Sequence, residues 1–219
     1  MVYTILMQKY SVLRVIILYI LITAVWAGYR YFFVMPEWVD EVIAKPVIDL
    51  LPILSVVVLV EKNSLESLGL TRHNYWFNAL MGLGLGALLL FESVMTRYFK
   101  NGSVSVLSLA PASLLLNLGI SFATAFTEET VFRGYFFRRF MWIWESEVAA
   151  NILSTVFFTV AHLPLAIFAL HYSGGQIFTY SLEIYVLGTI FAYVFARVES
   201  IVPTTIAHTI WNFANVFIK

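Results

Sequence analysis

Long apolar segments alternate with short polar stretches along almost the entire chain. A helix needs about 20 apolar residues to cross the hydrocarbon core of a bilayer. Segments that meet or approach this length lie roughly at 13–34, 47–60, 75–98, 111–144, 148–164, 182–197 and 203–219. The pattern predicts an all-α fold, a polytopic membrane helix bundle of about seven transmembrane helices, with eight as the alternative.

Proline and glycine positions refine this picture. The second segment follows Pro46 and is short, and Pro164 is expected to end or bend the fifth helix. Gly82 and Gly86 lie four residues apart in the third segment. Small residues at this spacing let two membrane helices approach closely. The polar stretch 61–74 is predicted to be an interfacial connector.

Composition supports a membrane protein and excludes several other classes. Apolar residues make up 61% of the 219 residues and charged residues only 12%, with a mean hydropathy of +0.86. A soluble domain carries about 25% charged residues, because its surface must be largely polar. Lysine and arginine number 13, as do aspartate and glutamate, so no basic surplus attracts nucleic acid. Cysteine is absent, which excludes disulfides, thiol nucleophiles and thiolate metal sites.

Three polar clusters interrupt apolar helical segments. Ionisable groups in such segments are costly unless they are paired or hydrated, and they are candidates for function by default. A polar packing network without chemistry is the alternative reading of these residues. The clusters are Glu128-Glu129-x-x-x-Arg133, Phe158-x-x-x-His162 and His208-x-x-x-Asn212.

Helical geometry predicts which of these side chains meet. Glu129 and Arg133 are four residues apart and are expected to form an ion pair. Glu128 points about 100° away from Glu129 and is free to face another helix. Glu128 and His162 are equally far from position 145, which lies in a polar turn. If two antiparallel helices meet at that turn, both residues lie at the same depth and can approach one another.

The third cluster completes a set of groups suited to hydrolysis. His208 and Asn212 are also four residues apart and share one helix face. We hypothesise that Glu128 acts as a general base and that His162 positions the same water. His208 and Asn212 can donate hydrogen bonds to a developing oxyanion. Such an assembly would hydrolyse an amide bond.

Other classes of intramembrane protease lack their signatures in this chain. The sequence has no H-E-x-x-H motif of zinc proteases and no G-x-S-G motif of rhomboid-type serine proteases. It has no G-x-G-D motif, and both of its aspartates, Asp40 and Asp49, lie in one early region. The remaining class uses glutamate.

The ordered motifs resemble those of a known family. Residues 128–134, Glu-Glu-Thr-Val-Phe-Arg-Gly, are similar to the E-E-x-x-x-R-G signature of the CAAX protease and bacteriocin-processing family, also called the ABI family. Residues 158–162 are similar to its F-x-x-x-H motif and residues 208–212 to its H-x-x-x-N motif. The resemblance covers roughly residues 111–217, and the ordered trio is its specific feature.

The resemblance implies a glutamic-type intramembrane endopeptidase that acts on a membrane-associated protein or peptide. In that family the first glutamate and the second motif's histidine activate water, which assigns these roles to Glu128 and His162. The third motif forms the oxyanion hole, which assigns His208 and Asn212 to it. The family is linked in prokaryotes to bacteriocin maturation and immunity and to the processing of surface-anchored proteins.

The same resemblance suggests how the chain is organised. Glu129 and Arg133 are expected to brace the site. Residues 1–110 are expected to supply N-terminal transmembrane helices and the connector, and residues 111–219 the catalytic core helices. No cofactor is expected. A zinc-dependent mechanism stays open at this point, since two glutamates and two histidines could in principle ligate zinc.

We expect an integral protein of a prokaryotic cell membrane with a cytoplasmic N-terminus. That orientation places more Lys and Arg residues on the cytoplasmic side than on the other, where Lys45 falls. The alternative from a different class is a non-enzymatic membrane scaffold or immunity protein, or a proton-coupled transporter. A transporter needs acidic residues along a path to both faces, whereas here they cluster at one depth beside an amide donor.

Overall fold

The computed structural model describes residues 2–218, with side chains from residue 12 onward, and the chain is helical nearly throughout. Within residues 2–218 the β-pairing consists of one isolated bridge between Val106 and Ile218, so the all-α prediction is confirmed. The helical elements in chain order are α1 (Val2–Phe32), α2 (Glu37–Val39), η1 (Asp40–Ala44), η2 (Pro46–Leu50), α3 (Leu51–Ser55), η3 (Val56–Val60), η4 (Leu65–Leu68), α4 (Tyr75–Asn101), α5 (Pro111–Glu128), η5 (Glu129–Phe137), α6 (Arg138–Trp144), α7 (Glu147–Pro164), η6 (Leu165–Ala169), α8 (Gly174–Val198) and α9 (Val202–Phe217).

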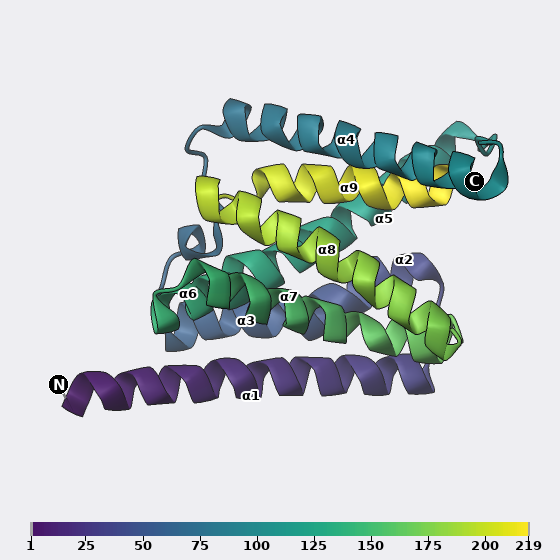
Figure 1. The fold of residues 1–219 in the computed structure, drawn as a ribbon. Coiled ribbons are helices and arrows are strands. Elements are labelled where there is room, and N and C mark those ends of the chain that lie inside the picture. The colour runs from purple at the N-terminus through teal and green to yellow at the C-terminus, as the bar shows by residue number, and fades with distance from the viewer. Residues whose placement is uncertain (1, 219) are drawn as a thin grey trace.

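The long helices lie side by side, and successive ones run in opposite directions (Figure 1). α1 lies along one side of the bundle and α4 along the opposite side. α9 packs against both α4 and α5, and α7 packs against both α1 and α8. The labelled N- and C-terminal ends lie at opposite ends of the bundle.

The outer surface of the bundle is apolar, as a bilayer requires. Leu80 on α4 is 68% exposed and Leu115 on α5 is 71% exposed, which would be unfavourable in water for so many large side chains. By length and composition, five helices of the described chain could cross a membrane: 12–32, 37–60, 75–101, 147–169 and 174–198. The other two expected spans are also helical, as the continuous helix 111–144 and as α9. The chain is an integral membrane protein.

The second helix begins ten residues earlier than the sequence pattern predicts. It starts at Glu37 and continues through Pro46 to Val60, so the prediction that the span follows Pro46 is wrong. The early turns carry charged side chains, which shorten the apparent apolar run. Two of these charged side chains, Asp40 and Lys45, are buried. Asp40 accepts a hydrogen bond from Tyr29 Oη at 2.6 Å and ion-pairs with Arg30.

Two other helix boundaries differ from the expected ones. α8 begins at Gly174 rather than near residue 182, because the Ser173 side chain and Gln176 form a capping box that satisfies the first turn. The helix that contains α7 runs past Pro164 and continues through the π-helical turn η6 to Ala169. The helix therefore changes from α-helical to π-helical after this proline and does not end there.

Close helix packing accounts for the glycines of α4. A Cβ atom added at Gly82 would lie 2.7 Å from the carbonyl oxygen of Pro203, and one at Gly86 would collide with the Ile210 side chain. Both contacts are with α9. The small-residue spacing therefore serves helix packing, as predicted.

The connector 61–74 folds back onto the bundle. Its turn η4 buries Leu68 completely, and Gly134 of η5 leaves room for the Leu68 carbonyl, where a Cβ atom would collide. Arg139 of α6 donates to the Ser67 carbonyl at 3.0 Å and pairs with Glu61. These contacts fix η5, which begins at Glu129, beside the rest of the polar cluster.

Candidate active site

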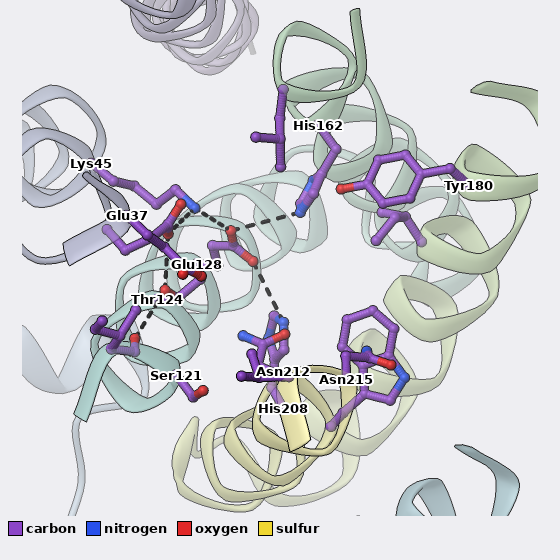
Figure 2. Close-up of a pocket in the computed structure, with 16 residues that line it drawn as sticks. Glu37, Lys45, Ser121, Thr124, Glu128, His162, Tyr180, His208, Asn212 and Asn215 are labelled. Atoms are coloured by element: carbon purple, nitrogen blue, oxygen red, sulfur yellow. Dashed lines mark hydrogen bonds and ion pairs between the residues drawn. The ribbon is translucent and has the colours of Figure 1, made fainter. Parts of the chain in front are cut away.

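Four of the six predicted site residues line one cavity of about 240 Å³. Glu128 reaches it from the end of α5, His162 from α7, and His208 and Asn212 from α9 (Figure 2). Glu37 and Asn215 also line it, near the ends of their helices. The structure therefore brings together predicted site residues as far apart in the sequence as Glu128 and Asn212.

The predicted meeting of Glu128 and His162 is observed. α6 ends at Trp144, Glu145 adopts a left-handed conformation, and α7 begins at Glu147. The two helices pack against each other. His162 Nε2 consequently lies 3.7 Å from Glu128 Oε1.

Glu128 is buried and its two carboxylate oxygens have different surroundings. Oε1 accepts a hydrogen bond from Lys45 Nζ at 2.9 Å. Oε2 lies 3.6 Å from His208 Nε2 and has no hydrogen-bond partner among the described residues. A buried carboxylate oxygen without a partner is costly, so this atom is suited to accept a hydrogen bond from water in the cavity.

The second motif sets both the tautomer and the packing of its histidine. His162 Nδ1 lies 2.8 Å from the carbonyl oxygen of Phe158, one helical turn earlier. Because a carbonyl oxygen only accepts, Nδ1 is the donor, and Nε2 of the neutral ring is an acceptor that faces Glu128. The Phe158 ring also covers the Arg133 guanidinium at 4.2 Å. Phe158 therefore contacts both His162, which lines the cavity, and the buried Arg133.

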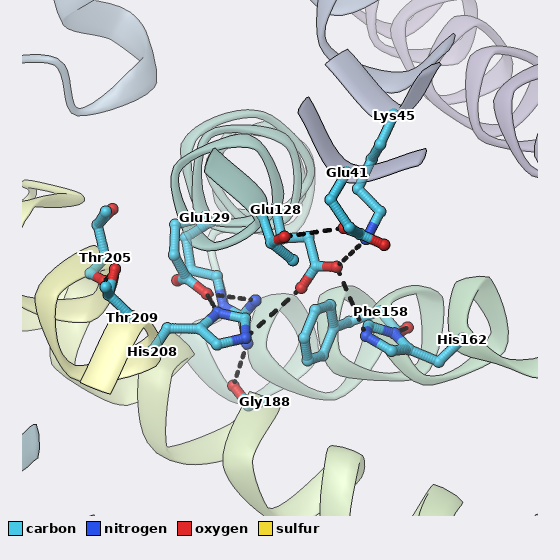
Figure 3. Close-up of polar contacts among 12 residues, drawn as sticks. Glu41, Lys45, Glu128, Glu129, Phe158, His162, Gly188, Thr205, His208 and Thr209 are labelled. Carbon is cyan, nitrogen blue, oxygen red and sulfur yellow. Dashed lines mark hydrogen bonds and ion pairs between the residues drawn. The ribbon is translucent and has the colours of Figure 1, made fainter. Parts of the chain in front are cut away.

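Behind the cavity, Glu129 forms a buried cluster with Arg133 and His208, and Figure 3 shows Glu129 beside His208. Its Oε1 lies 3.1 Å from Arg133 Nη1, which is the predicted ion pair, and 2.9 Å from His208 Nδ1. Arg133 Nη2 donates to the Gly188 carbonyl at 3.2 Å. The three ionisable side chains are buried. Glu129 therefore fixes the ring orientation of His208 as well as the position of Arg133.

Sequence reasoning missed the carboxylate and the ammonium that the second helix places beside Glu128, among other polar residues of the cavity. Glu41 and Lys45 line it, and Lys45 contacts Glu128 directly. The sequence pattern places Lys45 before the second helix, on the side opposite the N-terminus. The usable signal was the i, i+4 spacing of opposite charges next to an apolar run, which is typical of a helix.

No group of three or more His, Asp or Glu side chains that could hold a metal ion was found among the described residues. Glu129, the second glutamate of the first motif, ion-pairs with Arg133 and contacts His208 Nδ1. A site without a metal cofactor stays a prediction, with zinc dependence as its alternative, and chelation distinguishes the two.

Comparison with protein families gives one match. The family model described as Type II CAAX prenyl endopeptidase Rce1-like matches residues 110–214. Comparison with curated proteins and comparison with solved structures each gave no match. The matched residues contain all three motifs that line the cavity and extend from the start of α5 nearly to the end of α9. Residues 110–214, nearly half of the chain, thus match the CAAX protease and bacteriocin-processing family of membrane proteases.

Proposed function

We propose that this protein is a glutamic-type intramembrane endopeptidase that hydrolyses a peptide bond with water activated by Glu128. One observation carries the proposal. The unpartnered Oε2 of Glu128 lies in a cavity that is also lined by two histidines and an asparagine. The substrate is a membrane-associated protein or peptide, and the protein resides in a prokaryotic cell membrane with its N-terminus in the cytoplasm.

The first step uses Glu128 and His162. His162 Nε2 lies 3.7 Å from Glu128 Oε1, so the two side chains are near enough to share one water. That water donates one hydrogen bond to the carboxylate and the other to His162 Nε2. A lone pair of the water oxygen is then free to attack the peptide carbonyl carbon. As the new C–O bond forms, Glu128 takes a proton from the water, acting as general base. Glu128 then gives this proton to the leaving amine as the C–N bond breaks.

The oxyanion of the tetrahedral intermediate is stabilised from α9. The Asn212 side-chain amide supplies a neutral donor. His208 Nδ1 is already directed at Glu129, so donation from Nε2 requires the doubly protonated ring. Carboxylates of Glu128 and Glu129 flank that ring and balance its charge. Donors held in place before the reaction stabilise the transition state without reorganisation.

The test compares wild type with Glu128→Gln in proteoliposomes. The substrates are fluorescence-quenched peptides, one set with a lipidated C-terminal cysteine and one set anchored by a hydrophobic helix, and mass spectrometry identifies the products. Glu128→Gln should abolish cleavage and remain folded. Glu92→Gln on the exposed side of α4 is the matched control and should cleave normally.

Near-normal turnover by Glu128→Gln would show that the proposed base is wrong. Proton movement across the liposome membrane without cleavage of any peptide would instead support the transporter alternative.

A further inference from the structure

Two side chains of the second helix pair with two side chains of α5 in matching register. Thr124 Oγ1 donates to Glu41 Oε2 at 2.9 Å, and Lys45 Nζ donates to Glu128 Oε1 at 2.9 Å. Both pairs are 83 residues apart in the sequence. Glu41 and Lys45 lie one helical turn apart, as do Thr124 and Glu128. The two helices therefore run parallel here and are joined by two adjacent polar contacts.

Lys45 itself is held in place from several sides. It is 7% exposed and forms ion pairs with both Glu41 and Glu128. Its ammonium lies 5.4 Å from the centre of the Trp26 ring on α1. A lysine that is buried, paired and packed in this way has little rotamer freedom, so it can fix the orientation of the carboxylate that it binds.

We propose that Lys45 is a positioning residue for Glu128. This inference rests on the function proposed above. Lys45 binds Oε1 and thereby turns Oε2 toward the cavity, where the water is activated. Lys45 also compensates the negative charge of the buried carboxylate, which is otherwise expensive in a membrane-embedded site.

The charges around the cavity show why this cation matters. Among the described residues that line the cavity, Lys45 is the sole Lys or Arg, against the carboxylates of Glu37, Glu41 and Glu128. Removal of Lys45 leaves three carboxylates without a fixed cation in the cavity. Lys45 and Glu41 also lie outside the matched residues 110–214. The N-terminal part of the chain therefore contributes directly to the active centre.

The first experiment measures kcat and KM of Lys45→Met and Lys45→Arg in proteoliposomes, normalised to the folded fraction. A carboxylate displaced by about 1 Å loses roughly 100-fold in rate. We expect Lys45→Met to lower kcat by about this factor with little change in KM. Lys45→Arg, which keeps the charge, should recover most of the loss. Arg139→Met is the matched control, because it removes the cation of a buried ion pair with Glu61 that lies outside the cavity.

A chemical rescue separates positioning from folding. The chain has no cysteine, so Lys45→Cys introduces a single thiol. Alkylation with 2-bromoethylamine rebuilds a side chain of lysine's length with an ammonium, whereas 1-iodopropane gives a neutral side chain of the same length. We expect the first reagent to restore kcat and the second to leave it low, with the same preparation of folded protein in both arms.

Several results would overturn the proposal. These are an unchanged kcat in folded Lys45→Met, equal rescue by both reagents, or an equal loss of kcat per folded molecule in Arg139→Met. If Glu128→Gln cleaves normally, the proposed function itself fails. If Glu128→Gln is inactive while Lys45→Met is fully active, only the positioning role fails.

Discussion

Glu129→Gln should destabilise the protein more than Glu128→Gln, although the two residues are neighbours. Glu129 is the carboxylate that pairs with Arg133, which is 1% exposed. Its replacement by glutamine leaves a buried guanidinium with the Gly188 carbonyl but no carboxylate. Replacement of Glu128, in contrast, leaves Lys45 paired with Glu41.

The magnitude follows from the cost of an uncompensated buried charge. Removal of one partner from a buried ion pair costs about 3–5 kcal/mol. Glutamine keeps a side-chain oxygen that can accept from His208 Nδ1, and the Phe158 ring still covers Arg133. We therefore expect a loss near the lower end, about 3 kcal/mol. This corresponds to a roughly hundredfold change in the unfolding equilibrium.

The assay is unfolding in mixed micelles by titration with sodium dodecyl sulfate, followed by tryptophan fluorescence. The double variant Glu129→Gln/Arg133→Met removes the uncompensated charge and should recover at least about 1 kcal/mol of the loss. A Glu129→Gln protein within about 0.5 kcal/mol of wild type, with no gain on the second substitution, would refute this reasoning.

Three further predictions test packing, metal dependence and the oxyanion site. Gly134→Ala should destabilise the protein by about 1–3 kcal/mol in the same titration, because the added Cβ atom collides with the Leu68 carbonyl, whereas Gly84→Ala, with open space around it, should not. Peptide cleavage should survive exhaustive dialysis against a strong chelator, and elemental analysis should find no stoichiometric zinc; activity that is lost on chelation and restored by zinc alone would contradict this. Asn212→Ala should lower kcat by about 10²–10³-fold with a smaller change in KM, and full activity would remove Asn212 from the oxyanion site.

The contacts that the sequence alone predicts are those within one helix or across one short turn. Glu129 and Arg133 pair because the helix repeat sets their relative position. Glu128 and His162 meet because a short turn joins two helices that must then run antiparallel. The apolar segments likewise indicate the bundle, since each must span the bilayer. The starts of the second helix and of α8 are less predictable. Charged side chains interrupt the apolar pattern in the first turns of the second helix, and a capping box starts α8 at Gly174 ahead of its apolar run.

The sequence by itself thus determined the helical membrane fold, the three motifs and the residues expected to carry chemistry. Only the tertiary structure decided that His208 Nδ1 bonds to Glu129 and that Lys45 binds Glu128. These partners come from helices that are not joined by a short turn. Their pairing depends on the packing of the whole bundle, because the rotation and depth of one helix against another are set by side chains along their entire contact. No local spacing encodes that register.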